Sequence, residues 1–325
     1  MDAANAKIED STENPALPGY YGVPVIHGSH WKWLIIWYFF FGGMSGASAV
    51  IAALSRLAGG PSNATLTRTA TYVSFAALVP CPALLILDLG RPRRFLNMVR
   101  VFRPSSPMSL GSWGLAAFGL VSTLATAYQA SIDLSIRSGK HAKGHRHIEQ
   151  SLALVSATTG FFLAGYTGVL LAATAVPLWS KRPGLLGPLF LSSAMTSGAA
   201  AVTVATAVGG AEDRRLDALH RLEAMSTIAE GALLTCWLVR LGSTGKPVTE
   251  GRLDAVVRHG VVGAGMVIPL AMTAIAQWTP ARHRRTLTTV ASLLTLLGVF
   301  ALRYSVVEGG RRSADDPQAT FDLTG

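Results

Sequence analysis

Apolar stretches of about 20 residues or more recur along this chain and constrain its fold more than any other feature. A helix of that length crosses a hydrocarbon core of about 30 Å. In lipid, only helices and closed barrels satisfy their own backbone hydrogen-bonding groups, and the alternation typical of barrel strands is absent from the sequence. Half of the 325 residues are hydrophobic and only 14% are charged. The sequence therefore predicts an all-α, polytopic membrane protein.

Eight transmembrane helices are predicted, at residues 31–56, 66–89, 111–136, 151–178, 187–208, 216–241, 254–278 and 285–307. They form one transmembrane domain over 31–307, between a polar N-terminal tail (1–30) and a polar C-terminal tail (308–325). Pro80 and Pro82 predict a kink in the second helix, and the Gly42/Gly46 spacing favours close helix packing. An even number of helices places both termini on one face of the membrane, side A, opposite side B.

Composition excludes several classes of function. The formal net charge is +10, but Lys and Arg are spread over the connections, which favours lipid headgroups over nucleic acid as their contacts. The two cysteines, Cys81 and Cys236, lie inside apolar segments, and no Cys-x-x-Cys occurs. His220, His259 and His283 all fall near helix ends, so they do not form a haem ligand pair. We therefore expect no metal, haem or iron–sulfur cluster in this chain.

The connection with the strongest pattern is Leu84–Trp113, LLILDLGRPRRFLNMVRVFRPSSPMSLGSW, on side A. Near it we expect His30 and Tyr166, and with Asp88 and Arg91 they form a candidate quinone pocket. A quinone has two carbonyl oxygens that need donors and protons on reduction, which His, Tyr and carboxyl groups supply. The rest of the segment is expected to face a redox partner or headgroups, through Arg93, Arg94, Arg103 and Ser109.

Charged residues inside predicted spans indicate a second site. Glu230 lies in the middle of the sixth helix and Arg303 in the eighth. A guanidinium is not readily neutralised, so Arg303 needs an anionic or carbonyl partner, and its candidate carboxylates are Glu230, Asp88 and Glu308. Glu223 lies nearer side B on the same helix as Glu230. Together Glu223, Glu230 and Arg303 predict a proton-transfer route, with a structural polar cluster as the alternative.

Three stretches carry a family resemblance: YYGVPVIHGSHWKWLIIWYFFFGGMSGAS, LILDLGRPRRFLNMVRVFRPSSPMSLGSW, and GYTGVLLAATAVPLW followed by SSAMTSGAA. They resemble the NrfD/polysulfide reductase membrane-subunit family over the first five helices. The resemblance implies a haem-free, multi-pass subunit in a bacterial plasma membrane that exchanges electrons with menaquinone or another quinone. It also implies a ferredoxin-like iron–sulfur subunit and a molybdopterin catalytic subunit as partners.

The same resemblance implies quinone contacts from a histidine early in the first helix and a tyrosine in the fourth. His30 and Tyr166 match these positions, and His27 competes with His30. Asp88 and Arg91 belong to the shared LDLGRP block. Two other functions stay open, a transporter-like proton-conducting subunit and a purely structural membrane anchor.

Overall fold

The computed structural model describes residues 31, 33–89, 93–138, 145–209 and 213–314. Within these ranges the chain is almost entirely helical and has no strand. Eight of its helical spans are long and apolar enough to cross a membrane. The predicted all-α class with eight transmembrane helices is confirmed.

The N-terminal half supplies four spans, one of them broken. Its helices are α1 (Trp33–Ala58), α2 (Pro61–Leu78), α3 (Pro80–Asp88), α4 (Arg93–Arg100), α5 (Pro107–Arg137) and α6 (Arg146–Ala172). The second span is split into α2 and α3 at Val79, immediately before Pro80, where the sequence predicted a kink. A proline has no backbone N–H, so the helical hydrogen-bond ladder is interrupted there.

The C-terminal half supplies the other four spans. Its elements are α7 (Pro177–Ser180), α8 (Pro183–Val208), α9 (Asp213–Leu241), η2 (Gly242–Gly245), α10 (Lys246–Thr249), α11 (Gly251–Ala255), the π-helical η3 (Val256–Val267), α12 (Ile268–Ala276) and α13 (Ala281–Ala314). Helix α13 continues to Ala314, past the expected end of the transmembrane domain at residue 307. Gly310 of this extension packs on the Trp179 ring. Trp179 Nε1 also donates to the carbonyl of Val306, just before the extension, at 2.8 Å.

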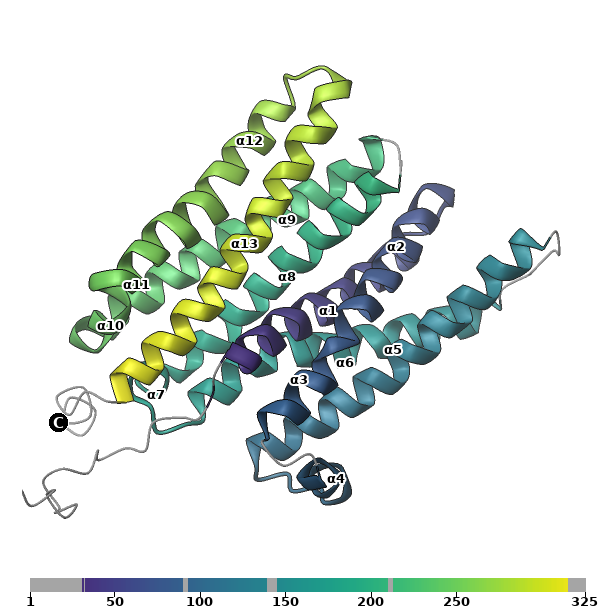
Figure 1. Cartoon of the computed structure of the whole chain (residues 1–325). Coiled ribbons are helices and arrows are strands. Elements are labelled where there is room, and N and C mark those ends of the chain that lie inside the picture. Colours follow the sequence, from purple (N-terminus) through teal and green to yellow (C-terminus); the bar gives the residue numbers. More distant parts are fainter. Residues whose placement is uncertain (1–30, 32, 90–92, 139–144, 210–212, 315–325) are drawn as a thin grey trace, which may run out of the picture.

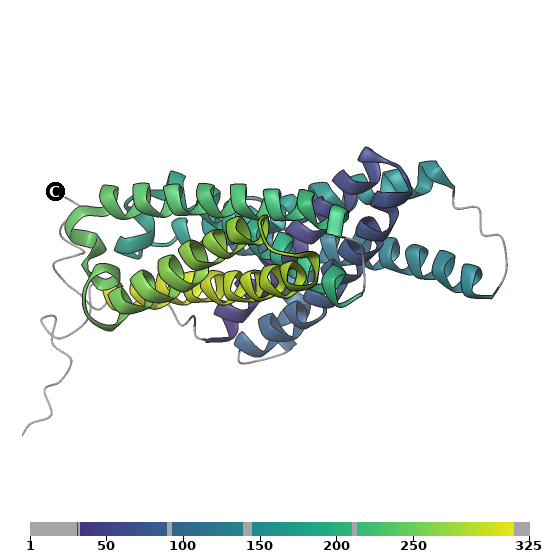
Figure 2. The same cartoon turned by 90° about the horizontal axis from the view of Figure 1, so that it is seen from above.

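Helix α1 lies at the centre of the molecule. It packs against α2, α6 and α8. In its most apolar 18-residue stretch, 78% of the residues are buried, whereas the corresponding value for α5 is 28%. Figures 1 and 2 show α2, α3, α5 and α6 to one side of α1, and α9, α12 and α13 to the other. Helix α1 therefore belongs to the interior of both halves.

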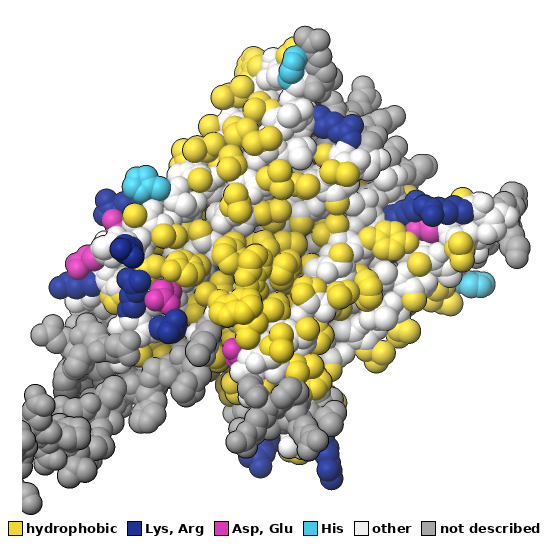
Figure 3. Space-filling model, viewed as in Figure 1, with side chains coloured by type: hydrophobic (Ala, Val, Ile, Leu, Met, Phe, Trp, Pro, Cys, Tyr) yellow, Lys and Arg dark blue, Asp and Glu magenta, His cyan; other side chains and the backbone are white. Residues whose placement is uncertain are grey.

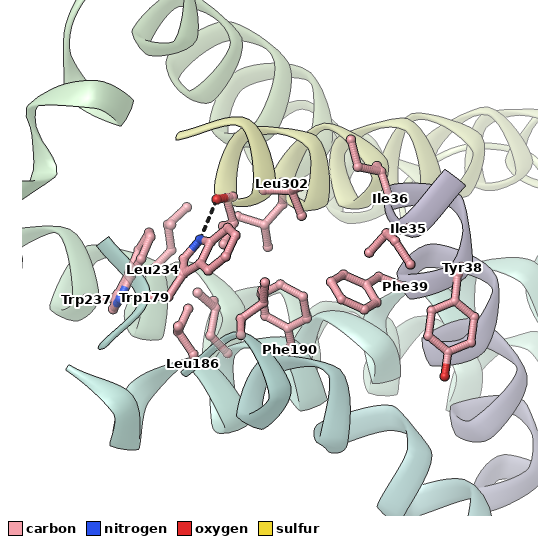
Figure 4. Packing of buried hydrophobic residues seen from close by; sticks show 14 of the residues in the cluster. Ile35, Ile36, Tyr38, Phe39, Trp179, Leu186, Phe190, Leu234, Trp237 and Leu302 are labelled. Carbon is pink, nitrogen blue, oxygen red and sulfur yellow. Dashed lines mark hydrogen bonds between the residues drawn. The ribbon is translucent and has the colours of Figure 1, made fainter. Parts of the chain in front are cut away.

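The largest core cluster fills the side A half of the interior. Figure 4 shows Phe39 of α1, Trp179 of α7, Phe190 of α8 and Trp237 of α9 packed beneath α13. The outer face in Figure 3 is apolar across its middle, while Lys, Arg, Asp and Glu gather towards the ends. This pattern is that of a surface in contact with lipid.

A glycine pair brings α1 and α6 into close contact. A Cβ atom built on Gly46 would overlap the backbone carbonyl of Gly160. This contact confirms the predicted close packing at Gly46, whereas a Cβ on Gly42 would make only ordinary contacts, with Tyr38 and Cys81 Sγ. By contrast, nothing lies within 4 Å of a Cβ built on Gly119 of α5.

Substitution of Gly46 by alanine is expected to destabilise the protein. Alanine favours a helix over glycine by about 1 kcal/mol, but overpacking against a backbone costs about 1–3 kcal/mol. The Gly46→Ala variant should therefore unfold at a lower temperature than wild type in detergent, measured by thermal denaturation. Gly119→Ala is the matched control and should unfold at the same or a higher temperature. Equal stability of both variants would contradict the α1–α6 contact.

Candidate functional site

A cavity of about 510 Å³ opens at side A between α1, α3, α4, α5 and α6. Its volume lies in the range of small-molecule sites. Its walls are mainly apolar, with a few polar groups, and are formed by Trp31, Ile35, Tyr38, Phe39, Leu85, Asp88, Leu89, Met98, Met108, Gly111, Ser112, Tyr166 and Leu170. The sequence predicted a pocket here, and the cavity brings Tyr166 and Asp88 together.

Tyr166 projects from α6 towards the start of α5. Its hydroxyl donates a hydrogen bond to the backbone carbonyl of Pro107. A Cβ atom on Gly111 would overlap the Tyr166 ring, so a glycine is required where α5 passes it. Phe162 stacks on the same ring with centroids 5.3 Å apart. The phenol is thus fixed in position in the cavity wall.

Tyr38 contributes a second phenol to the cavity from α1. Figure 4 shows its hydroxyl turned away from Phe39 and Phe190, at the edge of the apolar cluster. Trp31, just before α1, forms another part of the wall and stacks on Trp179 with centroids 5.5 Å apart. Polar groups therefore reach the cavity from two helices that pack against each other.

The segment Leu84–Trp113 forms much of the cavity wall. Leu85, Asp88 and Leu89 enter from the end of α3, and Met98 enters from α4. Ser109 stabilises the turn into α5, because its Oγ accepts from the Arg103 backbone N–H at 2.9 Å. The end of α3, helix α4 and the turn into α5 therefore form the side A part of the cavity wall.

The structure describes only some of the predicted site residues. His30 and Arg91 lie outside the described residues, as do the side chains of Arg93 and Arg94 in α4. The Arg103 side chain is exposed. Ser109, predicted to face a partner, is used in the turn before α5.

A buried polar cluster lies behind the cavity. The guanidinium of Arg303, fully buried in α13, donates to Ser193 Oγ of α8. Ser193 Oγ donates in turn to Glu230 Oε1 of α9 at 2.5 Å. Ser193 therefore connects the two charged residues, and Glu230 is one of the three carboxylates predicted as partners for Arg303.

Backbone oxygens complete the surroundings of Arg303. Its Nη2 donates to the Phe190 carbonyl at 3.4 Å and its Nε to the Phe39 carbonyl at 3.5 Å, both long hydrogen bonds. The guanidinium carbon lies 5.1 Å from the centre of the Phe190 ring. Phe39 also lines the cavity, so this residue of α1 contacts both the cavity and the Arg303 cluster.

One oxygen of this cluster is open to a further ligand. Glu230 Oε2 is buried and has no hydrogen-bond partner among the described residues. A buried acceptor of this kind is costly unless a proton or a water molecule occupies it. A proton or a water molecule at Glu230 Oε2 would satisfy this buried oxygen.

Glu223 lies two turns nearer side B on α9. Its Oε2 accepts from Ser292 Oγ of α13 at 2.9 Å, and 7% of the residue is exposed. Between Glu223 and side B lies a cavity of about 270 Å³, lined in part by Asp217 and His220. A row of polar groups therefore runs along α9 from side B to Glu230.

Sequence reasoning missed three residues of this region. Ser193 was hidden in a stretch of small residues, Tyr38 in a run of aromatic residues, and Gly111 in the start of α5. Their roles depend on contacts with residues 37 or more positions away. The only available signal was that Ser193 and Tyr38 are polar residues inside apolar spans.

The fold and the site define a polytopic helical membrane protein with a ligand-sized cavity at one membrane face and a buried charge cluster behind it. The family model described as "Polysulphide reductase, NrfD" matches residues 26–313. The chain therefore belongs to the NrfD family of polysulphide reductase membrane proteins, as the sequence motifs suggested.

Curated relatives support the same assignment. The protein is 25% identical to protein NrfD of Escherichia coli over 310 residues, which covers 86% of its own length and 95% of the relative. It is 23% identical to the NrfD homologue of Haemophilus influenzae, with 86% and 94% covered. It is 25% identical to the C subunit of polysulfide reductase from Wolinella succinogenes, with the same coverage of 86% and 94%. These similarities are consistent with a redox role.

Removal of the Glu230 carboxyl group is expected to destabilise the protein strongly. In Glu230→Ala, the buried Arg303 loses its nearest anion, and the loss of one partner from a buried charged cluster costs about 3–5 kcal/mol. The readout is the temperature of unfolding in detergent. Exposed Glu250 provides the control Glu250→Ala, which should match wild type. A Glu230→Ala protein as stable as wild type would show that Arg303 does not depend on Glu230.

Proposed function

We propose that this protein is the quinone-reactive membrane subunit of a multi-subunit oxidoreductase. It exchanges electrons between an iron–sulfur partner subunit and menaquinone or another quinone bound in the side A cavity. The observation that carries the proposal is this cavity, which places two phenols and a carboxyl group in an apolar pocket at the membrane edge. Family membership adds a redox context.

The cavity chemistry suits a quinone headgroup. Its apolar walls match a flat ring and a lipophilic tail, and the Tyr38 hydroxyl can donate to a carbonyl oxygen. The Tyr166 hydroxyl donates to the Pro107 carbonyl in this structure, and in our proposal it turns to a carbonyl oxygen of the bound quinone. Asp88 offers a carboxyl group at the end of α3. In this proposal Tyr166 binds and orients the substrate, while Asp88 exchanges protons with side A. His30 and Arg91 complete the proposed contacts.

The proposed partners follow from the division of labour in such a complex. One relative is named as the C subunit of polysulfide reductase, a name that implies other subunits. The present protein has only two cysteines, so we place the electron-carrying clusters in a ferredoxin-like partner and the substrate reaction in a molybdopterin subunit. We propose that the ferredoxin-like partner docks on side A through Arg93, Arg94 and Arg103, in a bacterial plasma membrane.

We further propose that the Arg303 cluster handles protons for the quinone reaction. Glu230 has a buried oxygen without a hydrogen-bond partner among the described residues, and Phe39 contacts both Arg303 and the cavity. Glu223 supplies a second carboxyl group towards side B. Neither a structural anchor nor a transporter requires a side A cavity of this chemistry, so we favour the quinone-reactive role over both alternatives.

Replacement of Tyr166 by phenylalanine is expected to weaken the quinone reaction. The variant keeps the ring beside Gly111 but loses the donor, and one such interaction is worth about tenfold in kcat/KM. The measurement is quinone-coupled turnover of the assembled complex. Tyr304→Phe, at a partly exposed position of α13, is the matched control and should behave as wild type. Unchanged kinetics in Tyr166→Phe would refute the quinone assignment of the cavity.

Replacement of Glu230 by glutamine is expected to slow proton delivery. The amide oxygen still accepts from Ser193, but the group no longer takes up a proton, and loss of such a group costs about 10²-fold or more in rate. Proton uptake during quinone reduction is followed with a pH-sensitive dye in vesicles that contain the complex. Glu308→Gln is the control, because Glu308 pairs with Arg311 at the end of α13. Normal uptake by Glu230→Gln would remove Glu230 from the proton route.

A further inference from the structure

A groove lies between α2 and α8 near side B, at the lipid-facing surface. Its volume is about 500 Å³, within the range of small-molecule sites. Residues of α2 between Thr65 and Ala76 form one wall, and Ala205, Thr206 and Gly209 at the end of α8 form the other. None of these residues lines the side A cavity, and the proposed function makes no use of the groove.

The groove is polar towards side B and apolar towards the membrane interior. Helix α2 begins at side B, so Thr65 lies about 16 Å nearer that side than Ala76. Thr65, Arg68 and Thr69 line the end near side B, whereas Val73 and Ala76 line the deeper end. An amphiphile with its polar head towards side B matches this order of residues.

Arg68 places a cation at the polar end. Its Nε lies 2.7 Å from Asp133 Oδ2 of α5, and 46% of its side chain is exposed. A guanidinium has five N–H donors in a planar fork, so a single carboxylate does not use them all. The same fork matches the oxygens of a phosphate group. Arg68 is therefore placed to bind a second anion at the membrane surface.

The surroundings of Arg68 carry an excess of positive charge. Arg68 and Thr65 also line an inlet of about 570 Å³ between α1, α2, α5 and α6. There Arg56 pairs with Glu149, while Arg146 is exposed and has no ion pair among the described residues. With Arg68 and Asp133, the inlet holds three arginines and two carboxylates, so one positive charge is left over. Basic pockets between membrane helices are typical sites for anionic lipid headgroups.

A buried hydroxyl in the groove wall lacks an acceptor. Only 2% of Thr206 is exposed, and its Oγ1 has no hydrogen-bond partner among the described residues. Other threonines here donate to the carbonyl four positions earlier, as Thr71 does to Thr67 at 2.8 Å. Because a buried hydroxyl without a partner is costly, this position suits a ligand that brings an acceptor, such as an ester carbonyl.

We propose that this groove binds one anionic phospholipid of the phosphatidylglycerol class. Its phosphodiester lies against Arg68, its glycerol headgroup reaches the inlet, and an acyl chain runs along the groove past Tyr72 and Val73. An ester carbonyl accepts from Thr206. A phosphatidylethanolamine brings an ammonium group as well as a phosphate, so it does not neutralise the remaining positive charge. The inference is independent of the quinone assignment.

The bound lipid would contact both halves of the protein. Helix α2 belongs to the N-terminal half and α8 to the C-terminal half, and both line the groove. A ligand that binds only the folded state stabilises it, and the stabilisation grows with ligand concentration. Phosphatidylglycerol is therefore expected to raise the temperature of unfolding of the delipidated protein.

The headgroup contact is tested with the full-length protein, delipidated in detergent and titrated with dioleoylphosphatidylglycerol. Native mass spectrometry counts the bound lipid. Arg68→Gln is expected to raise the Kd at least tenfold. Asp133 keeps two donors in this variant, the Tyr72 hydroxyl at 2.6 Å and Gln129 Nε2 at 3.2 Å, so the fold is retained.

Arg258→Gln is the matched control for the headgroup contact. Arg258 also pairs with an aspartate, at 2.6 Å, but lies on η3, away from the groove. This variant should bind the lipid as wild type does. Wild-type affinity in Arg68→Gln would overturn the proposal.

The acyl chain is tested with Ala76→Trp, which fills the deeper end of the groove at an exposed position. The Kd for dioleoylphosphatidylglycerol should rise at least tenfold. Ala127→Trp, at an exposed position of α5, is the control and should bind as wild type does. Tight binding by Ala76→Trp would show that the lipid does not occupy the groove and would overturn the proposal.

Two further probes test the identity of the ligand. Dioleoylphosphatidylethanolamine has the same chains and should bind wild type at least tenfold more weakly than dioleoylphosphatidylglycerol. Glycerol phosphate has no acyl chain and should not displace the bound lipid when present in large excess. Equal affinity for the two lipids, or displacement by glycerol phosphate, would overturn the assignment of an anionic phospholipid.

Discussion

The buried guanidinium of Arg303 is the constraint on which the rest of the structure depends. An arginine keeps its charge in a protein interior, so oxygen atoms must surround it wherever it is placed. Here they come from three other helices: the Phe39 carbonyl of α1, the Phe190 carbonyl and Ser193 hydroxyl of α8, and Glu230 of α9 through Ser193. This requirement fixes α1, α8, α9 and α13 relative to one another.

Those contacts occupy one face of α1, and another face packs against the helices of the N-terminal half. That face carries small residues between Arg56 and Tyr38, with Ser45 bonded to Ser74 of α2. Residues of α3, α4, α5 and α6 complete the side A cavity. A single helix thus contributes to the proposed quinone site and to the Arg303 cluster.

The segment Leu84–Trp113 illustrates how much of a site sequence reasoning can predict. Its break after Asp88 and its position between apolar helices located a pocket at side A, and Asp88 and Tyr166 do line one cavity. The pattern did not reveal that Ser109 would bind the Arg103 backbone in the turn before α5. A serine near a helix start has several possible local partners, and the path of the backbone decides among them.

The sequence by itself determined the membrane class, the eight spans, the break at Pro80 and the presence of buried charges. Each follows from local composition or local stereochemistry, because lipid leaves the backbone few options and proline lacks a donor. Only the tertiary structure decided that Ser193 joins Glu230 to Arg303, that Gly111 admits the Tyr166 ring, and that Arg56 meets Glu149. These contacts join residues far apart in the sequence, and the rotation and depth of each helix in the bundle determine which side chains meet.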